Sequence, residues 1–344
     1  MIAATQWSEI TSFANICRAA RRAALGQRRV RGTARFIERL EFEALQLERE
    51  LRSGEWRPAQ PTTFTIHDPK ERVITAAPFR DRVVHHALID PLEERFDASL
   101  VAETFACRRG KGTHAAIAHA RSLVRRHRYF LKLDIQKCFD SIDHGVVLDT
   151  LAPLGLEPEV MDLCERVLAG ADGKLGIGLP IGNLTSQWFA NLVLGRIDRL
   201  VLGELGMSGY LRYMDDFALF GEDKRALKEA HGAIEAFVRG ELRLALKSRA
   251  TILAPLSEGL PFLGWRLHPG TQRIRPKNLR RMRRRLKHRA WERRTGRIED
   301  VVFVAALRSA AVHLAHGDTL DLRRGWLRHF DNELGSGSPA PPTA

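Results

Sequence analysis

Two adjacent aspartates, Asp215 and Asp216, interrupt an otherwise apolar stretch in the segment LRYMDDFALF, which begins at Leu211. The apolar residues on both sides predict a hairpin of two strands with the aspartates at its turn. Acidic residues are ordinary in solvated turns, so the pair alone does not identify a site. The segment YFLKLDI, residues 129–135, predicts another apolar strand, and it carries one acid, Asp134. A sheet that pairs the two segments would bring three carboxylates together.

Three carboxylates at close range require cations. Like charges about 4 Å apart repel by roughly 4 kcal/mol at an effective dielectric constant of 20, so the cluster binds cations or takes up protons. Ligands that are all oxygen, without His or Cys, favour Mg²⁺, with Mn²⁺ as a substitute. Two such ions can flank an in-line phosphoryl displacement, where one activates the attacking hydroxyl and the other stabilises the leaving pyrophosphate. The three aspartates therefore predict a centre for nucleotidyl transfer.

The charge of the chain predicts a nucleic-acid partner. Its 344 residues include 55 Lys and Arg against 41 Asp and Glu, which gives a formal net charge of +14. Such an excess of positive charge favours binding to an extended polyanion, such as a nucleic acid. The alternative is a basic protein without such a partner, but the clustering in RRMRRRLKHRAWERR, Arg280 to Arg294, argues against it.

The location that the sequence predicts is the cytoplasm. The four cysteines lie far apart without a CxxC pair, so neither a zinc site nor a disulfide framework is indicated. No apolar run approaches the roughly 18 residues of a membrane span, and the N-terminus shows no signal pattern. The sequence GSGSPAPPTA, from Gly335, predicts a disordered tail.

Periodicity predicts several further elements. Apolar residues every three or four positions predict amphipathic helices, and β-branched runs around a turn sequence predict a hairpin. The predicted helices cover Thr33 to Arg52, Arg82 to Leu92 and Thr113 to Arg126, and the hairpin joins Thr62–Ile66 to Val73–Thr75. From Pro276 the chain again predicts a helix, with Leu279, Met282, Leu286 and Ala290 on its apolar face.

Two motifs in this order resemble the catalytic motifs of reverse transcriptases. They are YMDD, residues 213–216, and LDIQKCFDSID, residues 133–143. The stretch RVITAAPFRDRVVHHAL, residues 72–88, resembles the fingers motifs, and FLGWRL, residues 262–267, resembles the hairpin that grips the primer. The resemblance implies an α+β right-hand polymerase fold: fingers, a palm with a small antiparallel sheet flanked by helices, and a helical thumb.

The resemblance also implies a division of the chain and an activity. The N-terminal extension and fingers are expected at residues 1–125, and the palm at 126–270, with an insert at 150–185. The thumb is expected at 271–334 and the disordered tail at 335–344. The implied reaction is RNA-directed DNA synthesis, in which a primer 3′-OH attacks the α-phosphorus of a dNTP. The expected partners are an RNA template, the cDNA primer and product, and dNTPs, with no membrane.

The segment IGNLTSQ, residues 181–187, narrows the resemblance. Most reverse transcriptases carry QGxxxSP here, whereas an aliphatic first residue and a final Gln resemble the enzymes of diversity-generating retroelements. RRGKGTHAA, residues 108–116, and GLPIGNLTSQWFANLVL, residues 178–194, also resemble this group. The resemblance implies cDNA that is mutated at adenines of a template-repeat RNA, and a small, basic, oligomeric accessory protein as a partner.

The resemblance assigns roles around the three aspartates. Asp134, Asp215 and Asp216 are the expected catalytic and metal-binding residues, and Ile135 would lend a backbone carbonyl to a metal. Phe139 would act as an aromatic gate against a ribose 2′-OH, although a core Phe is the alternative. The other expected nucleotide-binding residues are Lys70, Arg72, Arg80, Ile181, Gly182, Gln187 and Lys247.

Ile181 is an expected determinant of fidelity. A Gln at this position could hydrogen-bond the incoming sugar, whereas Ile181 cannot, so a correct pair is less strictly required. The alternative is that Ile181 only packs beneath the nucleotide. Related enzymes also carry a Lys-Thr pair after the last palm helix, where this chain has Ala250 before Thr251. If that lysine protonates pyrophosphate, Lys247 or Arg249 must replace it.

Nucleic acid is expected along the hairpin and the thumb. The expected contacts are Tyr213, Met214, Gly264, Trp265, Arg280, Arg284 and Lys287, and the thumb would follow phosphates without reading sequence. A solvated charged helix is the alternative for the thumb. We expect Trp291, Trp326 and Phe330 to pack in the interior of the thumb. Elsewhere in the chain, we expect Asp143 or Ser141 to cap the helix that begins directly after these two residues.

Two other functions remain open. One is a different bacterial reverse transcriptase, from a retron, a group II intron or a phage-defence system. The other is a noncatalytic RNA-binding protein with the same fold, although such a protein has no reason to keep three repelling carboxylates together.

Overall fold

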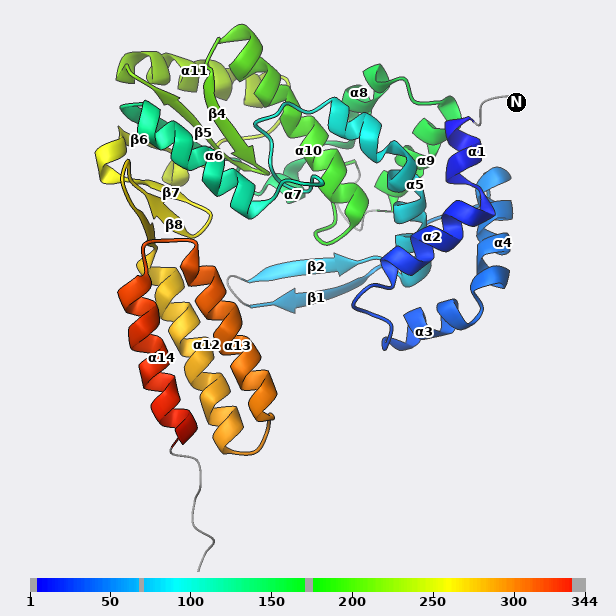
Figure 1. Ribbon diagram of the computed structural model, residues 1–344. Helices are drawn as coiled ribbons and strands as arrows, with labels where there is room; N and C mark the ends of the chain where they lie inside the picture. Colours follow the sequence, from blue (N-terminus) through cyan, green and yellow to red (C-terminus); the bar gives the residue numbers. More distant parts are fainter. Residues whose placement is uncertain (1–4, 68–70, 171–175, 336–344) are drawn as a thin grey trace, which may run out of the picture. The chain divides into compact units, whose positions relative to one another are not determined.

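The computed structural model describes residues 5–67, 71–170 and 176–335 (Figure 1). The chain forms two compact units by its internal contacts. Unit 1 comprises Met1–Ala116 and Leu131–Leu253, and unit 2 comprises Ile117–Phe130 and Ala254–Ala344. The division into fingers, palm and thumb stays a prediction, and all of the predicted tail except Gly335 lies outside the described residues.

The N-terminal part of unit 1 is helical. Its elements are α1 (Gln6–Ile10), α2 (Phe13–Ala23), α3 (Arg31–Glu38) and α4 (Leu40–Arg52). The single helix predicted from Thr33 to Arg52 is therefore wrong, because the backbone leaves the helical conformation at Arg39, with φ −110° and ψ 30°. The sequence pattern concealed this break because Phe36 and Leu40, both buried, keep a helical spacing across it.

The long helices of unit 1 form its core. They are α5 (Phe79–Ala98), α8 (His144–Leu151), α9 (Pro158–Ala169), α10 (Leu184–Arg199) and α11 (Lys224–Gly240), with the short helix α7 (Cys138–Ser141). Helix α10 is buried along most of its length and packs against α5, α8 and α11. Helix α5 is longer than predicted and contains Pro91. Two 3₁₀ turns, η1 (Ala152–Leu154) and η3 (Ser248–Ala250), and the π-helical turn η2 (Leu200–Glu204) complete this part.

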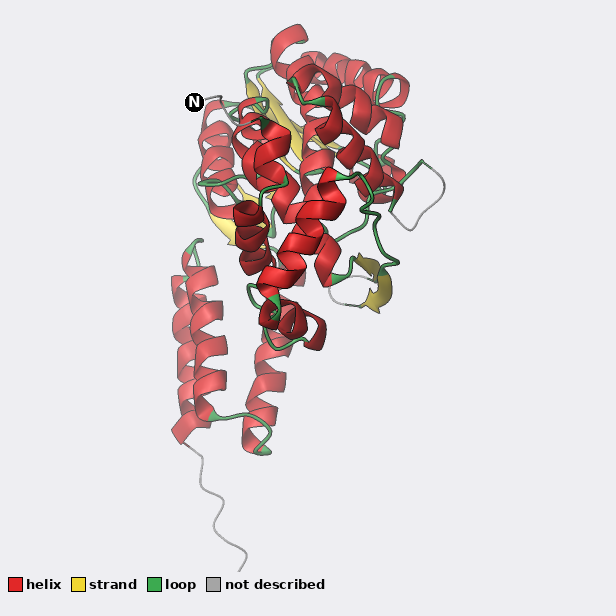
Figure 2. Ribbon diagram, turned by 90° about the vertical axis from the view of Figure 1, so that its right-hand side faces the viewer, coloured by secondary structure: helices red, strands yellow, loops and turns green. Residues whose placement is uncertain are grey.

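A four-stranded sheet carries the two acidic segments. Its strands are β3 (Tyr129–Asp134), β4 (Gly209–Tyr213), β5 (Asp216–Gly221) and β6 (Ile252–Pro255), in the order β4-β5-β3-β6. The chain passes between the two units within β3 and β6, and also within α6 (Thr113–Arg126). Strands β4 and β5 pair antiparallel, and both are mostly buried because helices surround the sheet (Figure 2).

A separate hairpin joins β1 (Thr62–Ile66) to β2 (Arg72–Ala76), as predicted. Its register pairs Thr62 with Ala76 and Ile66 with Arg72. The five residues of β1 are all exposed, so the hairpin is held mainly by its own ladder and by its attachment to α5.

Unit 2 contains a small sheet and a helical bundle. The strands β7 (Leu260–Phe262), β8 (Trp265–Leu267) and β9 (Gln272–Ile274) pair in this order, after the short turn η4 (Leu256–Glu258). The bundle consists of α12 (Pro276–Arg294), α13 (Asp300–Ala315) and α14 (Leu320–Gly335). Its core includes Leu286 and Ala290, with Leu279 and Met282 packed against it, as the helical spacing predicts.

Trp291 corrects one prediction about this bundle. Its side chain is 37% exposed, stacks on His288 and lies beneath Arg297, so it does not pack the core. Trp326 is buried as predicted, and nothing is described for the side chain of Phe330.

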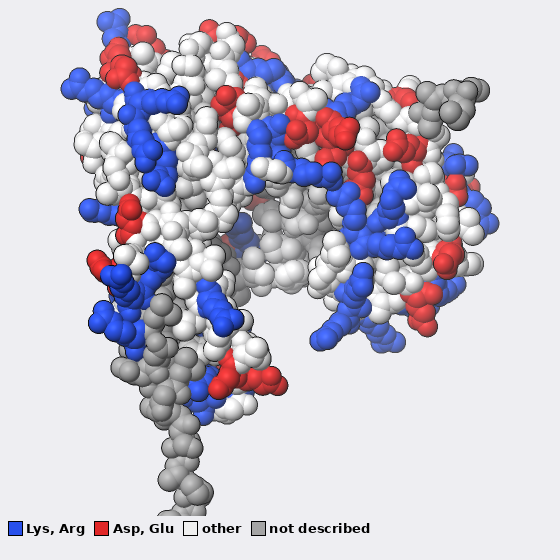
Figure 3. All heavy atoms as spheres, in the orientation of Figure 1, with Lys and Arg blue, Asp and Glu red and all other residues white. Residues whose placement is uncertain are grey.

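The cysteines, the helices and the surface charge have the following distribution. All four cysteines are free thiols, and no described helix combines the length and apolarity that a membrane span needs. Basic side chains gather over the α2–α3 end of unit 1 (Figure 3).

Candidate active site

The turn of the β4–β5 hairpin carries the paired aspartates. Tyr213 and Asp216 form the last pair of the ladder, so the two turn residues are Met214 and Asp215. This corrects the expectation that both aspartates occupy the turn: Asp216 is the first residue of β5. Met214 takes a left-handed backbone conformation, with φ +54°, which the tight reversal of the chain requires.

Asp134 ends the neighbouring strand β3. The next residue in the chain, Ile135, donates its backbone N–H to the backbone oxygen of Asp215 at 3.2 Å. The backbone of Lys247 donates to the backbone oxygen of Asp134 at 2.8 Å, so a third segment joins the same edge. The predicted pairing of the two acidic segments is therefore present, and the three aspartates meet at one edge of the sheet.

The electrostatics of the cluster match its geometry. Burial raises the pKa of the Asp215 carboxyl, and the charge of Asp134 raises it further, whereas Arg72 and Lys132 lower it. Burial raises the pKa of Asp216 to about 6, despite the opposing effect of Lys132. Both carboxyls therefore hold protons more tightly than exposed aspartates, as expected when negative charges are gathered in a partly dry site.

Two lysines partly offset the negative charge of the three aspartates. Lys132 Nζ forms an ion pair with Asp216 Oδ1, and Lys247 Nζ lies 3.6 Å from Asp134 Oδ1. Among the described residues no three His, Cys, Asp or Glu side chains already form a compact metal-binding group. Each ammonium group pairs with one carboxylate of the cluster, Lys132 with Asp216 and Lys247 with Asp134. Lys132 was missed from the sequence, although its position two residues before Asp134 places both side chains on one face of β3.

The basic residues expected at the triphosphate differ in their surroundings. Lys70 lies outside the described residues. Arg72 begins β2, is exposed, and is close enough to lower the pKa of Asp215. Arg80 makes two hydrogen bonds of 2.8 Å to the carboxylate of Glu50, so its charge is largely neutralised within the protein. Of the two described residues, Arg72 is the one whose charge acts on the carboxyl of Asp215.

The segment before α10 lies beside α7. Leu179 donates its backbone N–H to the backbone oxygen of Phe139 at 2.7 Å, which joins the half-buried Phe139 to the loop that carries Ile181. Gly182 has φ +114°, a conformation that L side chains rarely adopt, and an added Cβ would lie 3.7 Å from Ile74. The loop that carries Ile181, the segment with Phe139 and the β1–β2 hairpin are thus neighbours in unit 1.

A pocket collects two of the expected nucleotide-binding residues. Gly182 and Gln187 line it with Arg82, His85 and His86, together with Asn183 and Leu184. His85 is buried, and burial lowers its pKa to about 3, so this imidazole is neutral. The three residues from α5 were not expected here, because nothing in the sequence connects α5 to the segment before α10.

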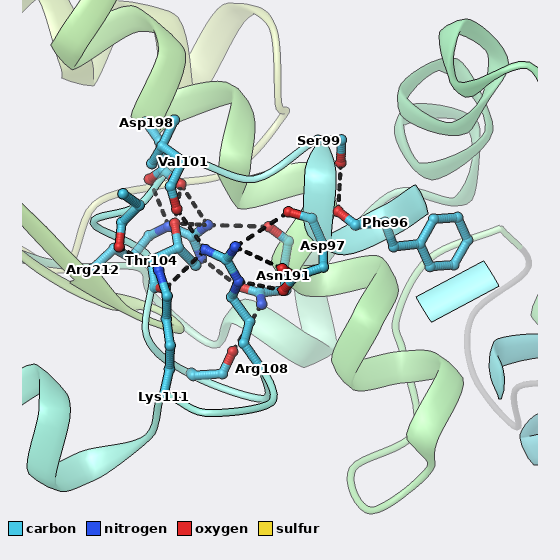
Figure 4. A network of polar contacts seen from close by, with 12 residues as sticks. Phe96, Asp97, Ser99, Val101, Thr104, Arg108, Lys111, Asn191, Asp198 and Arg212 are labelled. Atoms are coloured by element: carbon cyan, nitrogen blue, oxygen red, sulfur yellow. Dashed lines mark hydrogen bonds and ion pairs between the residues drawn. The ribbon is translucent and has the colours of Figure 1, made fainter. Parts of the chain in front are cut away.

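A buried network of hydrogen bonds around Arg212 supports the turn of the β4–β5 hairpin (Figure 4). The guanidinium of Arg212, which is fully buried, donates to both carboxylate oxygens of Asp198 at 2.7 Å. It also donates to Asn191 Oδ1 at 2.8 Å and to the Met214 carbonyl at 3.3 Å. Tyr210 Oη donates to Asp198 at 2.7 Å. Through Asn191 and Asp198, these hydrogen bonds connect the turn to α10, and the buried charged groups all have partners.

Two segments add further support to the hairpin. The backbone N–H of Arg212 donates to Glu103, and the backbone of Phe105 donates to Arg212, both within 3.0 Å. Thr104 Oγ1 donates to Asp198 at 2.6 Å, and Tyr213 Oη lies 3.1 Å from Thr113 Oγ1. Neither Arg212 nor Asp198 was singled out from the sequence, although a charged residue inside the apolar strand LRY was a signal for a buried partner.

The expected nucleic-acid contacts in unit 2 fall into two groups. Arg280, Arg284 and Lys287 are exposed on one face of α12. Trp265 is 1% exposed and packs on His313, so its side chain belongs to the core of unit 2 and is not available to nucleic acid. Gly264 has φ +92° and an added Cβ would clash with Asn278 at 2.5 Å, which explains the glycine by packing.

Comparisons with known proteins identify the family of the chain. The family model for "Reverse transcriptase (RNA-dependent DNA polymerase)" matches residues 66–266. The chain is 23% identical over 275 residues to Protein YkfC of Escherichia coli, which covers 67% of this chain and 72% of that protein. It is 25% identical over 162 residues to a putative COX1/OXI3 intron 1 protein of Saccharomyces cerevisiae, covering 44% of this chain and 19% of that protein.

The chain is shorter than most of these relatives. It is 31% identical over 97 residues to the mitochondrial nuclear intron maturase 1 of Arabidopsis thaliana, which covers 28% of this chain. The matches span 14% of that maturase and 19% of the yeast protein, so the chain corresponds to a small part of both.

Solved structures show the fold. The telomerase of Candida albicans, in complex with a fragment of telomeric RNA, has a TM-score of 0.51 and 13% identity, covering 81% of this chain and 55% of that chain. The apo telomerase of Candida tropicalis has a TM-score of 0.50 and 12% identity, covering 62% and 48%. The predicted fold class is confirmed: mixed helices with small antiparallel sheets, arranged as in right-hand polymerases.

Proposed function

Because the chain belongs to the reverse transcriptase (RNA-dependent DNA polymerase) family, we propose that it is an RNA-directed DNA polymerase. The observation that carries this proposal is the meeting of Asp134 with Asp215 and Asp216 at one edge of the sheet, through the hydrogen bond from Ile135 to Asp215. A protein that only binds RNA gains nothing from half-buried, mutually repelling carboxylates beside a surface-exposed arginine.

The donor set of this edge fits Mg²⁺. It consists of carboxylates without His or Cys, and oxygen ligands of this kind suit a hard cation that also binds substrate phosphates. Asp134, Asp215 and Asp216 would hold the ions, with the Ile135 carbonyl as a further ligand. When bound, Mg²⁺ supplies positive charge to the attacking and leaving oxygens.

The protein's own residues have separate tasks in this proposal. Arg72 binds the triphosphate, because it is exposed at the start of β2 and its charge lowers the pKa of Asp215. Lys247, which lies 3.6 Å from Asp134, delivers a proton to the leaving pyrophosphate in place of the lysine missing at Ala250. Phe139 limits the space beside the sugar, so that a 2′-OH is excluded.

The raised pKa of Asp216 predicts how pH governs metal binding. Its carboxyl binds a proton more tightly in the folded protein, with a pKa of about 6, than in the unfolded chain. Without metal, the stability that this group contributes is full at low pH and is lost as the pH rises through about 6. Mg²⁺ reverses the trend, because only the ionised carboxylate binds it.

Thermal unfolding tests this pH dependence. We expect saturating Mg²⁺ to raise Tm at about pH 7.5 and to have little effect at about pH 5. The Asp216→Asn variant should lose most of the Mg²⁺ effect at the higher pH. An equal increase in Tm at both pH values would show that this carboxylate does not take part in metal binding.

We further propose that the enzyme belongs to a diversity-generating retroelement and makes cDNA that is mutated at adenines. The support is the segment IGNLTSQ, whose Ile181 and Gln187 depart from the commoner QGxxxSP. Ile181 lies between Pro180 and Gly182. Gly182 has a backbone conformation that only glycine adopts easily, so the backbone on both sides of Ile181 is restricted. An accessory protein, basic and oligomeric, is part of this proposal.

Ile181→Gln tests the fidelity proposal. A glutamine amide can hydrogen-bond the nucleotide, and one such bond is worth about 1 kcal/mol, so misincorporation opposite template adenine should fall by roughly fivefold to tenfold. Ile177→Gln is the matched control, since Ile177 lies in the same loop, is 39% exposed, and should leave fidelity unchanged. If Ile181→Gln leaves the error spectrum as it was, Ile181 acts only by packing.

A second candidate has its own support. Two of the relatives are named as intron proteins or maturases, which favours an intron-type reverse transcriptase. Sequencing the DNA beside the gene separates the two: a template repeat with a variable repeat that differs at adenines supports the retroelement, and its absence favours the intron-type enzyme.

Primer extension tests the activity itself. The purified protein, given an RNA template, an annealed DNA primer, dNTPs and Mg²⁺, should synthesise DNA complementary to the RNA. Replacing dNTPs with NTPs should abolish synthesis, and Phe139→Ala should restore part of it. Absence of synthesis with every divalent metal and primer would refute the proposal.

A further inference from the structure

The densest positive charge of unit 1 lies far along the chain from the carboxylates. Residues 18–39 contain eight arginines and one acid, Glu38. This surplus of seven positive charges is half of the chain's formal net charge of +14. We call this region the arginine surface; its arginines, all exposed, are Arg18, Arg21, Arg22, Arg28, Arg29, Arg31, Arg35 and Arg39.

The packing of α2 and α3 turns these arginines outward. Helix α2 buries Ile16, Ala20 and Ala23, and it packs against α5. Helix α3 buries Thr33 and Phe36. The arginines follow the opposite faces at spacings of three and four residues, and the turn between the helices adds Arg28 and Arg29. In Figure 3 the basic spheres form a cluster over this end of the unit.

Little of this charge is neutralised within the protein. Arg22 pairs with Asp90 at 2.8 Å. Among the residues that the structure describes, no acidic side chain pairs with Arg28, Arg29, Arg31 or Arg35. Helix α11 is different, because its Arg225 and Arg239 pair with glutamates four residues away. Uncompensated like charges destabilise the folded state, so the arginine surface favours an external polyanion.

Exposed apolar side chains lie among the arginines. Leu25 and Val30, in the α2–α3 turn region, are 68% and 55% exposed. On α4, Phe42 is 53% exposed, and the Arg39 guanidinium lies 4.6 Å from its ring centroid. Cations beside a flat, exposed ring are typical of single-stranded nucleic-acid binding, in which phosphates contact arginines and bases stack on rings. A flat exposed ring adds base stacking to the charge, and only a nucleic acid offers bases to stack, so we favour nucleic acid over an acidic peptide or an anionic membrane.

The arginine surface is distant from the candidate active site. Helices α2 and α3 lie at the end of unit 1 away from the β4–β5 hairpin (Figure 1). A nucleic acid that reaches this surface therefore extends beyond the base pair being formed. We propose that the arginine surface binds a single-stranded segment of the template RNA outside the copied stretch. This proposal rests on the proposed function of an RNA-directed polymerase.

Two variants with equal changes of charge test the proposal. The first replaces Arg28, Arg29, Arg31 and Arg35 with Gln. The control replaces Lys224, Arg225, Lys228 and Arg239 on α11, all exposed, with Gln. The probes are two fluorescent RNA–DNA hybrids, both with a few unpaired template nucleotides to be copied beyond the primer 3′ end. In the first, the RNA continues past these nucleotides as a long single-stranded extension, and the second lacks that extension. Affinity is measured as a function of salt concentration.

The expected result is a loss that depends on the extension. Each phosphate contact on a single strand contributes about 0.7 to the slope of log K against log salt, so four lost contacts should lower this slope by about three. Affinity of the first variant for the extended hybrid should fall at least about tenfold at low salt. Its affinity for the hybrid without extension, and both affinities of the control, should stay near wild type.

Other outcomes overturn the proposal. They are an unchanged slope in the first variant, or equal losses in both variants. A loss of binding to vesicles that contain anionic lipid, with RNA binding intact, would also overturn it and assign the surface to a membrane. If the first variant does not fold, phenylglyoxal modification of wild type decides: the extended hybrid should protect these arginines at least about threefold, and lack of protection contradicts the proposal.

Primer extension on the hybrid without an extension keeps the two proposals apart. If wild type and the first variant extend it equally while the variant loses affinity for the extended hybrid, both proposals hold. If neither extends any primer, the polymerase proposal fails, whereas the salt dependence still reports on the arginine surface.

Discussion

Primer extension by an Asp215→Asn variant is expected to fall at least about a thousandfold, with the fold intact. The substitution keeps the size of the side chain but removes the charge that would hold Mg²⁺, which contributes several kcal/mol to the transition state. Because burial and Asp134 already raise the pKa of Asp215, removing its charge also relieves repulsion. The variant should therefore be as stable as wild type, or more stable, in the absence of metal.

Single-turnover extension rates with saturating dNTP measure this effect. The matched control is Asp140→Asn, in the motif that carries Asp134 but exposed and outside the cluster, and its rate should stay near wild type. RNA binding should be equal in all three proteins. A rate for Asp215→Asn within about tenfold of wild type would mean that this aspartate does not hold the catalytic metal.

The second large effect concerns stability. Arg212→Met should lower the free energy of unfolding by about 3–5 kcal/mol, because it leaves the Asp198 carboxylate buried without its charged partner. It also removes the donor to the Met214 carbonyl, so the turn before Asp215 loses an anchor. We expect lower activity at temperatures where the variant is still folded.

Denaturant unfolding of three variants separates charge from packing. Arg225→Met, in which an ion pair on a largely exposed side chain is lost, should cost less than about 1 kcal/mol. Combining Arg212→Met with Asp198→Asn removes the unpaired charge, so the double variant should be more stable than Arg212→Met alone. If Arg212→Met unfolds like wild type, the buried ion pair does not hold this part of the fold together.

Much of the sheet edge that carries the aspartates could be predicted from residues that are close together in the sequence. Apolar runs around Asp134 and around the paired aspartates predict strands by residue type, and β1, β2 and α6 appear where periodicity places them. Asp143 caps α8, accepting from the Val146 N–H at 3.2 Å, as its position before the helix indicates. Signals of this kind are local, since they depend on the neighbours of a residue in the chain.

The residues that were missed act across long distances in sequence. Arg212 meets Thr104 and Asn191, and Arg80 meets Glu50, through contacts that no periodicity encodes. Lys132 was overlooked because a lysine in a strand reads as solvent-exposed until its neighbouring strand is known. Trp265 was expected at nucleic acid because an aromatic residue in a turn motif does not reveal whether it packs inward, as it does here.

The pairing of Lys132 with Asp216 and of Lys247 with Asp134 has a practical result. Because these ammonium groups act as internal counterions, we expect the chain to reach its native state without divalent ions, unlike small zinc domains that unfold when their metal is removed. Purification with a chelator should yield folded, inactive protein that recovers when Mg²⁺ is added back, and such metal-free stocks allow a reaction to be started at a chosen moment.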